Sequence, residues 1–209
     1  ARELLIHNES YRLELDLTRQ ALDNLNNGWD VFLGLALLDN FLSSDSNNSE
    51  LSLWELMVLA EQGHETAMLQ LGKRYYTGKE VEQDYAKARE WFERAVEKGN
   101  TEAMLYLGDM YEKGFGGPTD FGKAKTLYEK AVERENAEAM CRLGLMYQEG
   151  RGIPSNPYTA RKWFEEANKK GHLGAKYKLA WMCLLGEGGP RDVERGKLLA
   201  EEGVRKGDG

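Results

Sequence analysis

The sequence predicts an all-α fold in which similar helix pairs stack into a solenoid. Two observations predict it. The same pattern of small and apolar residues recurs every 36 residues, without a gap, over four units. Within each unit, apolar residues follow helical spacing in two separate stretches that a Gly-rich loop joins. A helix pair of this length cannot bury both apolar faces alone, so neighbouring units must pack against each other.

The period is visible as columns of identical residues, and chance does not produce so many columns in register. We place the units at 64–99, 100–135, 136–171 and 172–207. Alanine, leucine and glycine recur in all four units and tyrosine in three: Ala67, Ala103, Ala139 and Ala175; Leu71, Leu107, Leu143 and Leu179; Gly78, Gly114, Gly150 and Gly186; Tyr75, Tyr111 and Tyr147.

The first helix of each unit carries a stripe of small and apolar residues, which in the first unit are Ala67, Met68, Leu71, Gly72 and Tyr75. The Gly-rich loop then ends in a side chain that accepts hydrogen bonds. This predicts the N-cap of the second helix at Asp84, Asp120, Asn156 and Asp192.

The second helix buries a second stripe, in the first unit Ala88, Trp91, Phe92 and Ala95. Its charged face favours ion pairs within the helix, such as Glu90 with Arg94. Three units end this helix at a glycine that tolerates a left-handed C-cap, namely Gly99, Gly171 and Gly207. Glu135 replaces that glycine once and Glu80 replaces a loop glycine, so we expect these two turns to be altered.

Residues 1–63 precede the regular units. The segment 11–28 predicts one helix that ends at Gly28, and 28–63 fits a degenerate repeat whose second helix falls at 51–63. A divergent terminal unit is expected where a solenoid must present an outer face to water. We therefore interpret 1–63 as an N-terminal helix plus a capping repeat.

The columns, A-x-x-x-L-G-x-M-Y-x-x-G-x-G followed by D-x-x-K-A-x-x-W-(F/Y)-x-x-A, resemble the Sel-1-like repeat family, relatives of the tetratricopeptide repeats. The likeness covers about 64–207, and departures are Arg74, Leu127, Leu199 and Cys183. It implies a right-handed α-α superhelix whose first helices line a concave side. In the second unit the likeness is carried by Leu107, Gly108, Met110, Tyr111, Gly114, Gly116, Asp120, Lys123, Ala124 and Ala131.

Composition excludes several classes of function. A net charge of −7 counts against a nucleic-acid binder, which usually presents a basic field. No apolar run approaches the length of a membrane span; the longest, 31–38, suits a core helix. The chain begins with Ala rather than Met, so a leader or other residues could have been removed. The compartment stays open, with the bacterial periplasm or secretion favoured over the cytoplasm.

The residues that carry chemistry do not assemble into a predicted catalytic or metal site. His64 and His172 share one repeat position three units apart, so each is expected to be solvated. Cys141 and Cys183 are six residues out of phase, too far apart for a disulfide, and predict buried free thiols. The run at 114–117 follows a helix and lacks a downstream Lys-Ser/Thr, so it predicts a turn rather than a phosphate loop. We expect neither enzyme activity nor a cofactor or metal.

A binding surface is expected on first-helix columns that stacking does not use. Tyr, Trp and Arg dominate interface energetics when they are desolvated. The candidates on the concave side are Lys73, Tyr76, Tyr106, Asp109, Arg142, Leu145, Lys178 and Trp181.

The predicted function is non-enzymatic capture of a partner protein with a basic surface, such as a signalling protein or a toxin. Family resemblance implies a bacterial adaptor, or an immunity protein that neutralises a toxic effector. The alternative is a structural component that acts through self-association; a monomer is favoured.

Overall fold

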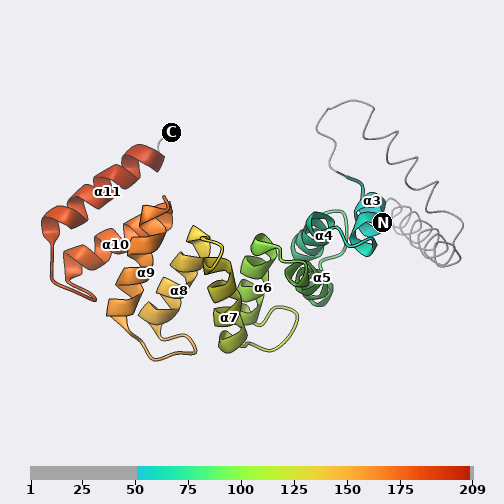
Figure 1. Ribbon diagram of the computed structural model, residues 1–209, viewed down its shortest axis with the longest axis horizontal. Coiled ribbons are helices and arrows are strands. Elements are labelled where there is room, and N and C mark those ends of the chain that lie inside the picture. Colours follow the sequence, from blue (N-terminus) through green and yellow to red (C-terminus); the bar gives the residue numbers. More distant parts are fainter. Residues whose placement is uncertain (1–50, 208–209) are drawn as a thin grey trace, which may run out of the picture. The chain divides into compact units, whose positions relative to one another are not determined.

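The computed structural model describes residues 51–207, and all secondary structure there is α-helical (Figure 1). The predicted all-α class is confirmed. The chain divides into two compact units, residues 1–54 and 55–209, and α4 to α11 lie in the second. The helices are α3 (Leu53–Glu61), α4 (Glu65–Thr77), α5 (Tyr85–Glu97), α6 (Thr101–Lys113), α7 (Phe121–Val132), α8 (Ala137–Glu149), α9 (Pro157–Lys169), α10 (Leu173–Leu185) and α11 (Val193–Gly207).

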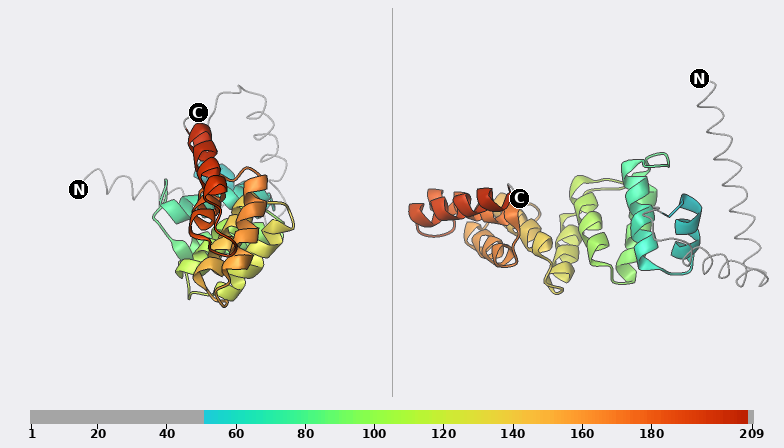
Figure 2. Two further views of the ribbon diagram at one scale, coloured as in Figure 1. Left: turned by 90° about the vertical axis from the view of Figure 1, so that its left-hand side faces the viewer. Right: turned by 90° about the horizontal axis from the view of Figure 1, so that it is seen from above.

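The eight helices from α4 to α11 form four antiparallel pairs that follow one another in chain order (Figures 1 and 2). Each helix contacts its partner in the pair, and the second helix of one pair contacts the first helix of the next. This is the stacking that the repeated stripes require. The predicted helix at 11–28 lies outside the described residues, as does most of the degenerate repeat at 28–63, whose last part contains α3.

Side-chain caps start the second helix of every pair, as predicted. Asp84, Asp120, Asn156 and Asp192 each accept a hydrogen bond from the backbone N–H three residues on, at 2.9 to 3.1 Å. A cap of this kind contributes about 1 kcal/mol by satisfying a helical N–H that has no partner within the helix. Asn100 and Asn136 cap α6 and α8 in the same way, in addition to the four predicted caps.

A glycine on the first helix lets an aromatic ring of the second helix reach the backbone. A Cβ at Gly72 would lie 2.5 Å from the Phe92 ring, and one at Gly144 would lie 2.6 Å from the Phe164 ring. Gly108 lies in the same way against Tyr128. All three rings are fully buried, so this contact forms the centre of each of the first three repeats.

A second glycine column marks the seam between neighbouring pairs. A Cβ at Gly116 would overlap the backbone of Tyr85, where α5 begins, and one at Gly188 would overlap Pro157, where α9 begins. A Cβ at Gly152 would instead overlap the Cβ of Phe121, at the start of α7. These three loops therefore touch the preceding pair at a place where a side chain does not fit.

The prediction of an altered turn is wrong for Glu80 but is confirmed for Glu135. Before Glu135, α7 has 12 residues and ends at Val132, one residue earlier than the equivalent 13-residue helices α5 and α9. Both residues keep the left-handed backbone of the glycines that they replace, with φ of 62° and 59°. Glu80 forms an ion pair with Arg74, whose side chain is 8% exposed and stands where the other repeats bury a methionine. Two departures from the repeat thus compensate each other within one pair.

Candidate functional site

The predicted binding residues lie on α4, α6, α8 and α10, the first helices of the four pairs. We call this set of eight the first-helix face: Lys73, Tyr76, Tyr106, Asp109, Arg142, Leu145, Lys178 and Trp181. Their position on a concave side stays a prediction. The structure divides them into side chains that contact one another and side chains that face solvent.

A chain of polar contacts links all four first helices. The Tyr76 hydroxyl donates to Asp109 Oδ2 at 3.4 Å, and Arg142 Nη1 donates to Asp109 Oδ1 at 3.2 Å. Arg142 Nε also donates to Glu138 at 2.7 Å, and Glu138 contacts His172 Nε2 at 2.6 Å. We call Tyr76, Asp109, Arg142, Glu138 and His172 the polar chain.

Asp109 is the centre of the polar chain. Its side chain is only 13% exposed and also accepts from Lys113 at 2.7 Å, so three donors from three helices converge on one carboxylate. Burial, followed by the charge of Asp109 and its hydrogen bond, raises the pKa of Tyr76. The site is therefore arranged to keep the Tyr76 hydroxyl protonated.

His172 closes the other end, and the prediction of a solvated histidine is wrong for it. Its Nδ1 accepts from the Ala175 backbone N–H at 2.9 Å and caps α10. Because Nδ1 accepts, Nε2 carries the proton that is donated to Glu138. Burial acts to raise the pKa of Glu138, but hydrogen bonds from His172 and Arg142 outweigh it and lower that pKa.

Aromatic rings fill the face between the first two pairs. Tyr76 contacts Tyr106 edge-on at 5.9 Å between centroids, and Tyr106 stacks on Phe92 at 5.1 Å. Lys73 lies over the Tyr106 ring at 5.4 Å and forms an ion pair with Glu102 at 2.6 Å. Tyr106 and Tyr76 are therefore half-buried and in contact with neighbours, so these two predicted binding residues also serve packing.

The exposed part of the first-helix face lies on α10. Tyr177, Trp181 and Leu185 follow one another at four-residue spacing and are 40%, 60% and 53% exposed. We call them the α10 stripe. Lys178 is exposed on the same helix and forms no ion pair within residues 51–207. Leu145, one pair earlier, is instead half-buried against the core.

A buried carboxyl group lies below the polar chain. The Glu112 side chain is 6% exposed, with Arg151 Nη1 at 3.7 Å. Burial raises the pKa of Glu112, although the charges of Arg151 and Arg142 oppose the rise. The Tyr128 hydroxyl is also buried and interacts with the Glu112 carboxyl, an interaction that adds to the effect of burial in raising the pKa of Tyr128. Tyr128 replaces the phenylalanine that repeats 1 and 3 place there.

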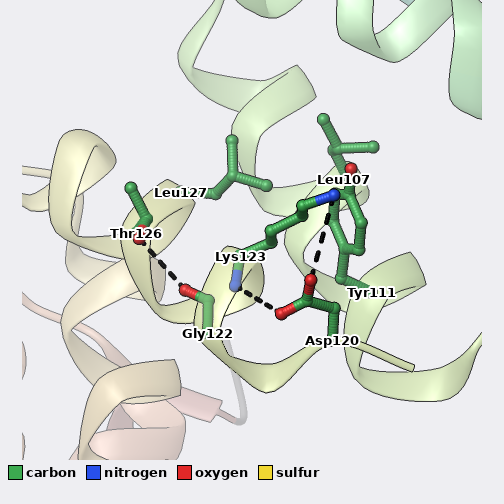
Figure 3. A pocket seen from close by; sticks show the side chains of 7 residues that line it. All are labelled: Leu107, Tyr111, Asp120, Gly122, Lys123, Thr126 and Leu127. Carbon is green, nitrogen blue, oxygen red and sulfur yellow. Dashed lines mark hydrogen bonds and ion pairs between the residues drawn. The ribbon is translucent and has the colours of Figure 1, made fainter. Parts of the chain in front are cut away.

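A pocket of about 460 Å³ opens between α6 and the start of α7 (Figure 3). Figure 3 shows Lys123 extended along one side of it, toward the ring of Tyr111. We call it the repeat-2 pocket, and its lining residues are Leu107, Tyr111, Asp120, Gly122, Lys123, Thr126 and Leu127.

The remaining candidates do not form a reactive centre. Cys141 and Cys183 are buried with free thiols, and burial raises the pKa of Cys141 to about 11, so its nucleophilic thiolate is scarce at neutral pH. Among residues 51–207 no cluster of three His, Cys, Asp or Glu could hold a metal ion. The expected Glu90–Arg94 pair is also replaced, since Arg94 contacts Glu61 at 3.0 Å.

Sequence reasoning missed Glu138 and His172 as members of the site. One signal was present for His172, because the same column carries Asn100 and Asn136, which are good N-cap residues. Glu138 could not be found in this way. It shares its column with Glu102, and nothing in that column shows that it reaches a histidine of the next pair.

Stacked helix pairs with first helices joined side by side define an α-helical repeat protein. Four segments match the Sel1 repeat family, at residues 66–100, 101–136, 137–172 and 174–208. The chain belongs to the Sel1 repeat family. Proteins with these repeats generally mediate protein–protein interaction, and the fold is a typical non-catalytic scaffold. No match was found among curated proteins.

Solved structures of the same family are similar to this chain. A Sel1 repeat protein from Oxalobacter formigenes is 26% identical with a TM-score of 0.69, over 73% of this chain and 62% of that one. A putative Sel1 repeat protein from Klebsiella pneumoniae is 25% identical with a TM-score of 0.50, over 74% of this chain and 76% of that one. None of the described helices is long and apolar enough to cross a membrane.

Proposed function

We propose that the chain captures a partner protein through its first helices, with the α10 stripe as the apolar anchor site. The exposure of the stripe carries this proposal. Three large apolar side chains stand in one row on α10. In the columns of Trp181 and Leu185, by contrast, α4, α6 and α8 carry polar residues at five of six positions, namely Lys73, Asp109, Thr77, Lys113 and Glu149. Exposed aromatic residues that become desolvated on binding supply most of the energy of an interface.

The partner that fits this surface presents an apolar side chain to Trp181 and a carboxylate to Lys178, which has no ion-pair partner in residues 51–207. Long-range attraction acts in addition, because a net charge of −7 favours the approach of a partner whose surface is basic elsewhere. The polar chain supports this role by holding the first helices in fixed positions, so that little entropy is lost on binding.

The role that we propose is that of a bacterial adaptor, or of an immunity or inhibitor protein that neutralises a toxic effector. The bacterial sources of the similar solved structures support a bacterial origin. Size alone does not separate the two roles, whereas the chemistry of the captured partner does. If the partner is a toxin, loss of capture would leave it free and toxic. Loss of capture of a signalling partner would cause no such toxicity.

The test uses Trp181→Ala and a matched control. Tyr158 on α9 is also an exposed aromatic, at 59%, but it lies on a second helix. Proteins captured by the wild-type chain are quantified by mass spectrometry, and their affinities are then measured by calorimetry. We expect Trp181→Ala to weaken binding at least about tenfold and Tyr158→Ala to leave it unchanged.

Two outcomes would contradict the proposal. Equal affinity of the wild-type and Trp181→Ala chains would show that the α10 stripe does not contact the partner. A mass that rises with concentration in light scattering, and falls back in Trp181→Ala, would show that the stripe joins copies of this chain.

A further inference from the structure

The repeat-2 pocket lies where the second helix of repeat 2 lacks an aromatic ring that repeats 1 and 3 carry. Leu127 occupies the column of Trp91 and Trp163, which are half-buried on the second helices of repeats 1 and 3. An indole is larger than the isobutyl group of leucine. The space that an indole takes up in those repeats is thus open to solvent beside Leu127.

Two further residues widen the opening. Gly122 stands where the neighbouring repeats carry Ala86 and Tyr158, and Thr126 stands where they carry Glu90 and Lys162. All three exchanges in repeat 2 are toward smaller side chains. A volume of about 460 Å³ suffices for a bicyclic side chain together with its backbone.

The electrostatics of the pocket favour an aromatic ring over an aliphatic group. The floor is apolar, because Leu107 and Leu127 line it; both are largely covered by their neighbours, at 3% and 8% exposed. The Lys123 ammonium group stands at the rim, 5.2 Å from the centroid of Tyr111. Its contact with Asp120 is long, at 3.9 Å, and its side chain is 61% exposed, so it remains available to the negative face of a second ring.

We propose that the repeat-2 pocket binds an aromatic side chain, of tryptophan type, from a partner protein. The ring lies on Leu107 and Leu127, in the place that Trp91 and Trp163 occupy in their own repeats, with the Lys123 ammonium group against its face. The pocket lies on α6 and α7, away from the α10 stripe, so this inference does not depend on the proposed function.

The probe is N-acetyl-tryptophanamide, which mimics a residue within a chain, and its matched control is N-acetyl-leucinamide. Both are titrated into the 209-residue chain and followed by amide chemical shifts. We expect saturable shifts at Gly122, Thr126 and Leu127, with a dissociation constant on the order of 1 mM. The leucine probe should bind at least about fivefold more weakly.

Variants separate this pocket from unspecific binding. Leu127→Trp restores the residue of the neighbouring repeats and should abolish the shifts. Thr126→Glu, which introduces the residue that repeat 1 carries as Glu90, narrows the rim and should weaken binding of the probe. It provides the test of the pocket if Leu127→Trp does not fold. Lys123→Met keeps the apolar stem and should reduce the preference for the tryptophan probe.

Several results would overturn the inference. These are the absence of saturable shifts, equal shifts in a folded Leu127→Trp or Thr126→Glu chain, or equal binding of the two probes. Tighter binding of free tryptophan than of the amide would indicate a metabolite site. Shifts at the same amides that depend on protein concentration without a probe, and vanish in Trp181→Ala, would assign the pocket to a second copy of this chain.

Discussion

Glu135 occupies a backbone conformation that suits glycine. Its φ of 59° costs about 1 kcal/mol or more for a residue with a Cβ, and its ion pair with Lys170 is exposed and contributes little. Glu135→Gly should therefore raise the free energy of unfolding by about 1 kcal/mol, because relief of strain exceeds the entropy that glycine adds to the unfolded chain. Urea denaturation measures the change.

The control lies two residues earlier. Glu133 has a right-handed φ of −56°, so Glu133→Gly should lower the free energy of unfolding by up to about 1 kcal/mol. The two substitutions are chemically the same and differ only in backbone conformation. The strain argument fails if both lower stability to the same extent.

Arg74 and Glu80 show how far sequence reasoning reaches at the level of residues. Each is recognisable as a departure from its column, because a column defines one environment. Their ion pair is not recognisable, since they occupy different columns and the pair exists in one repeat only. A repeat alignment identifies unusual residues but does not show which of them meet.

Close contact between the two helices of a pair depends on a glycine at a position that has no room for a methyl group. Gly144→Ala should lower the free energy of unfolding by about 2 kcal/mol, even though alanine favours helix, because its Cβ would lie 2.6 Å from the buried Phe164 ring. Thermal denaturation followed by circular dichroism provides the measurement.

A helical glycine in open surroundings gives the comparison. Gly122 on α7 is exposed, and a Cβ there would approach only Asp120 Oδ1, at 3.3 Å. Gly122→Ala should stabilise the chain by about 0.5 kcal/mol through helix propensity and reduced entropy of the unfolded state. If Gly122→Ala lowered the free energy of unfolding as much as Gly144→Ala, contact with the Phe164 ring would not be the cause of the loss at Gly144.

The pairing of helices was the part of the fold that the sequence predicted best. Apolar stripes, Gly-rich loops and N-caps are local signals, and each occurs four times, so an error in one unit is corrected by the others. Repetition did not improve the prediction of features that occur in one unit only. The pocket beside Leu127 forms where three residues smaller than their counterparts lie together. It could be recognised only once the positions of the surrounding side chains were known.

Across the molecule, the polar chain makes the stability of the first-helix face depend on pH. Because the pKa of Glu138 is lowered in the folded state, folding is favoured while Glu138 is ionised, above its usual value of 4.5. This contribution is lost as the pH falls below that value. Glu138→Gln should therefore show a weaker loss of unfolding free energy between neutral pH and pH values below 4.5.

Urea denaturation of both chains at several pH values measures this difference. Glu90→Gln on α5 is the control, because Glu90 is exposed and lies outside the polar chain. It should follow the wild-type curve. A Glu138→Gln curve parallel to the wild-type curve would show that contact with Arg142 and His172 does not couple to folding.

The candidate site could be predicted only in outline at this scale. Sequence columns placed its residues on the correct helices, yet Tyr76, Asp109 and Arg142 occupy three different columns. They meet because successive contacts join residues 33 apart, slightly less than one repeat. That offset follows from how neighbouring helices are displaced along their axes, which the repeat length does not reveal.

The seam glycines Gly116, Gly152 and Gly188 have a consequence for how such a gene can change. These three loops bring a residue without a side chain to the first turn of the second helix in the preceding pair. Duplication or deletion of one whole unit keeps every glycine at its seam. A recombination event that adds or removes a few codons between a helix start and the next seam glycine places a side chain where the preceding pair leaves no room for one. Copy number is therefore open to evolution, while the length of a copy is not.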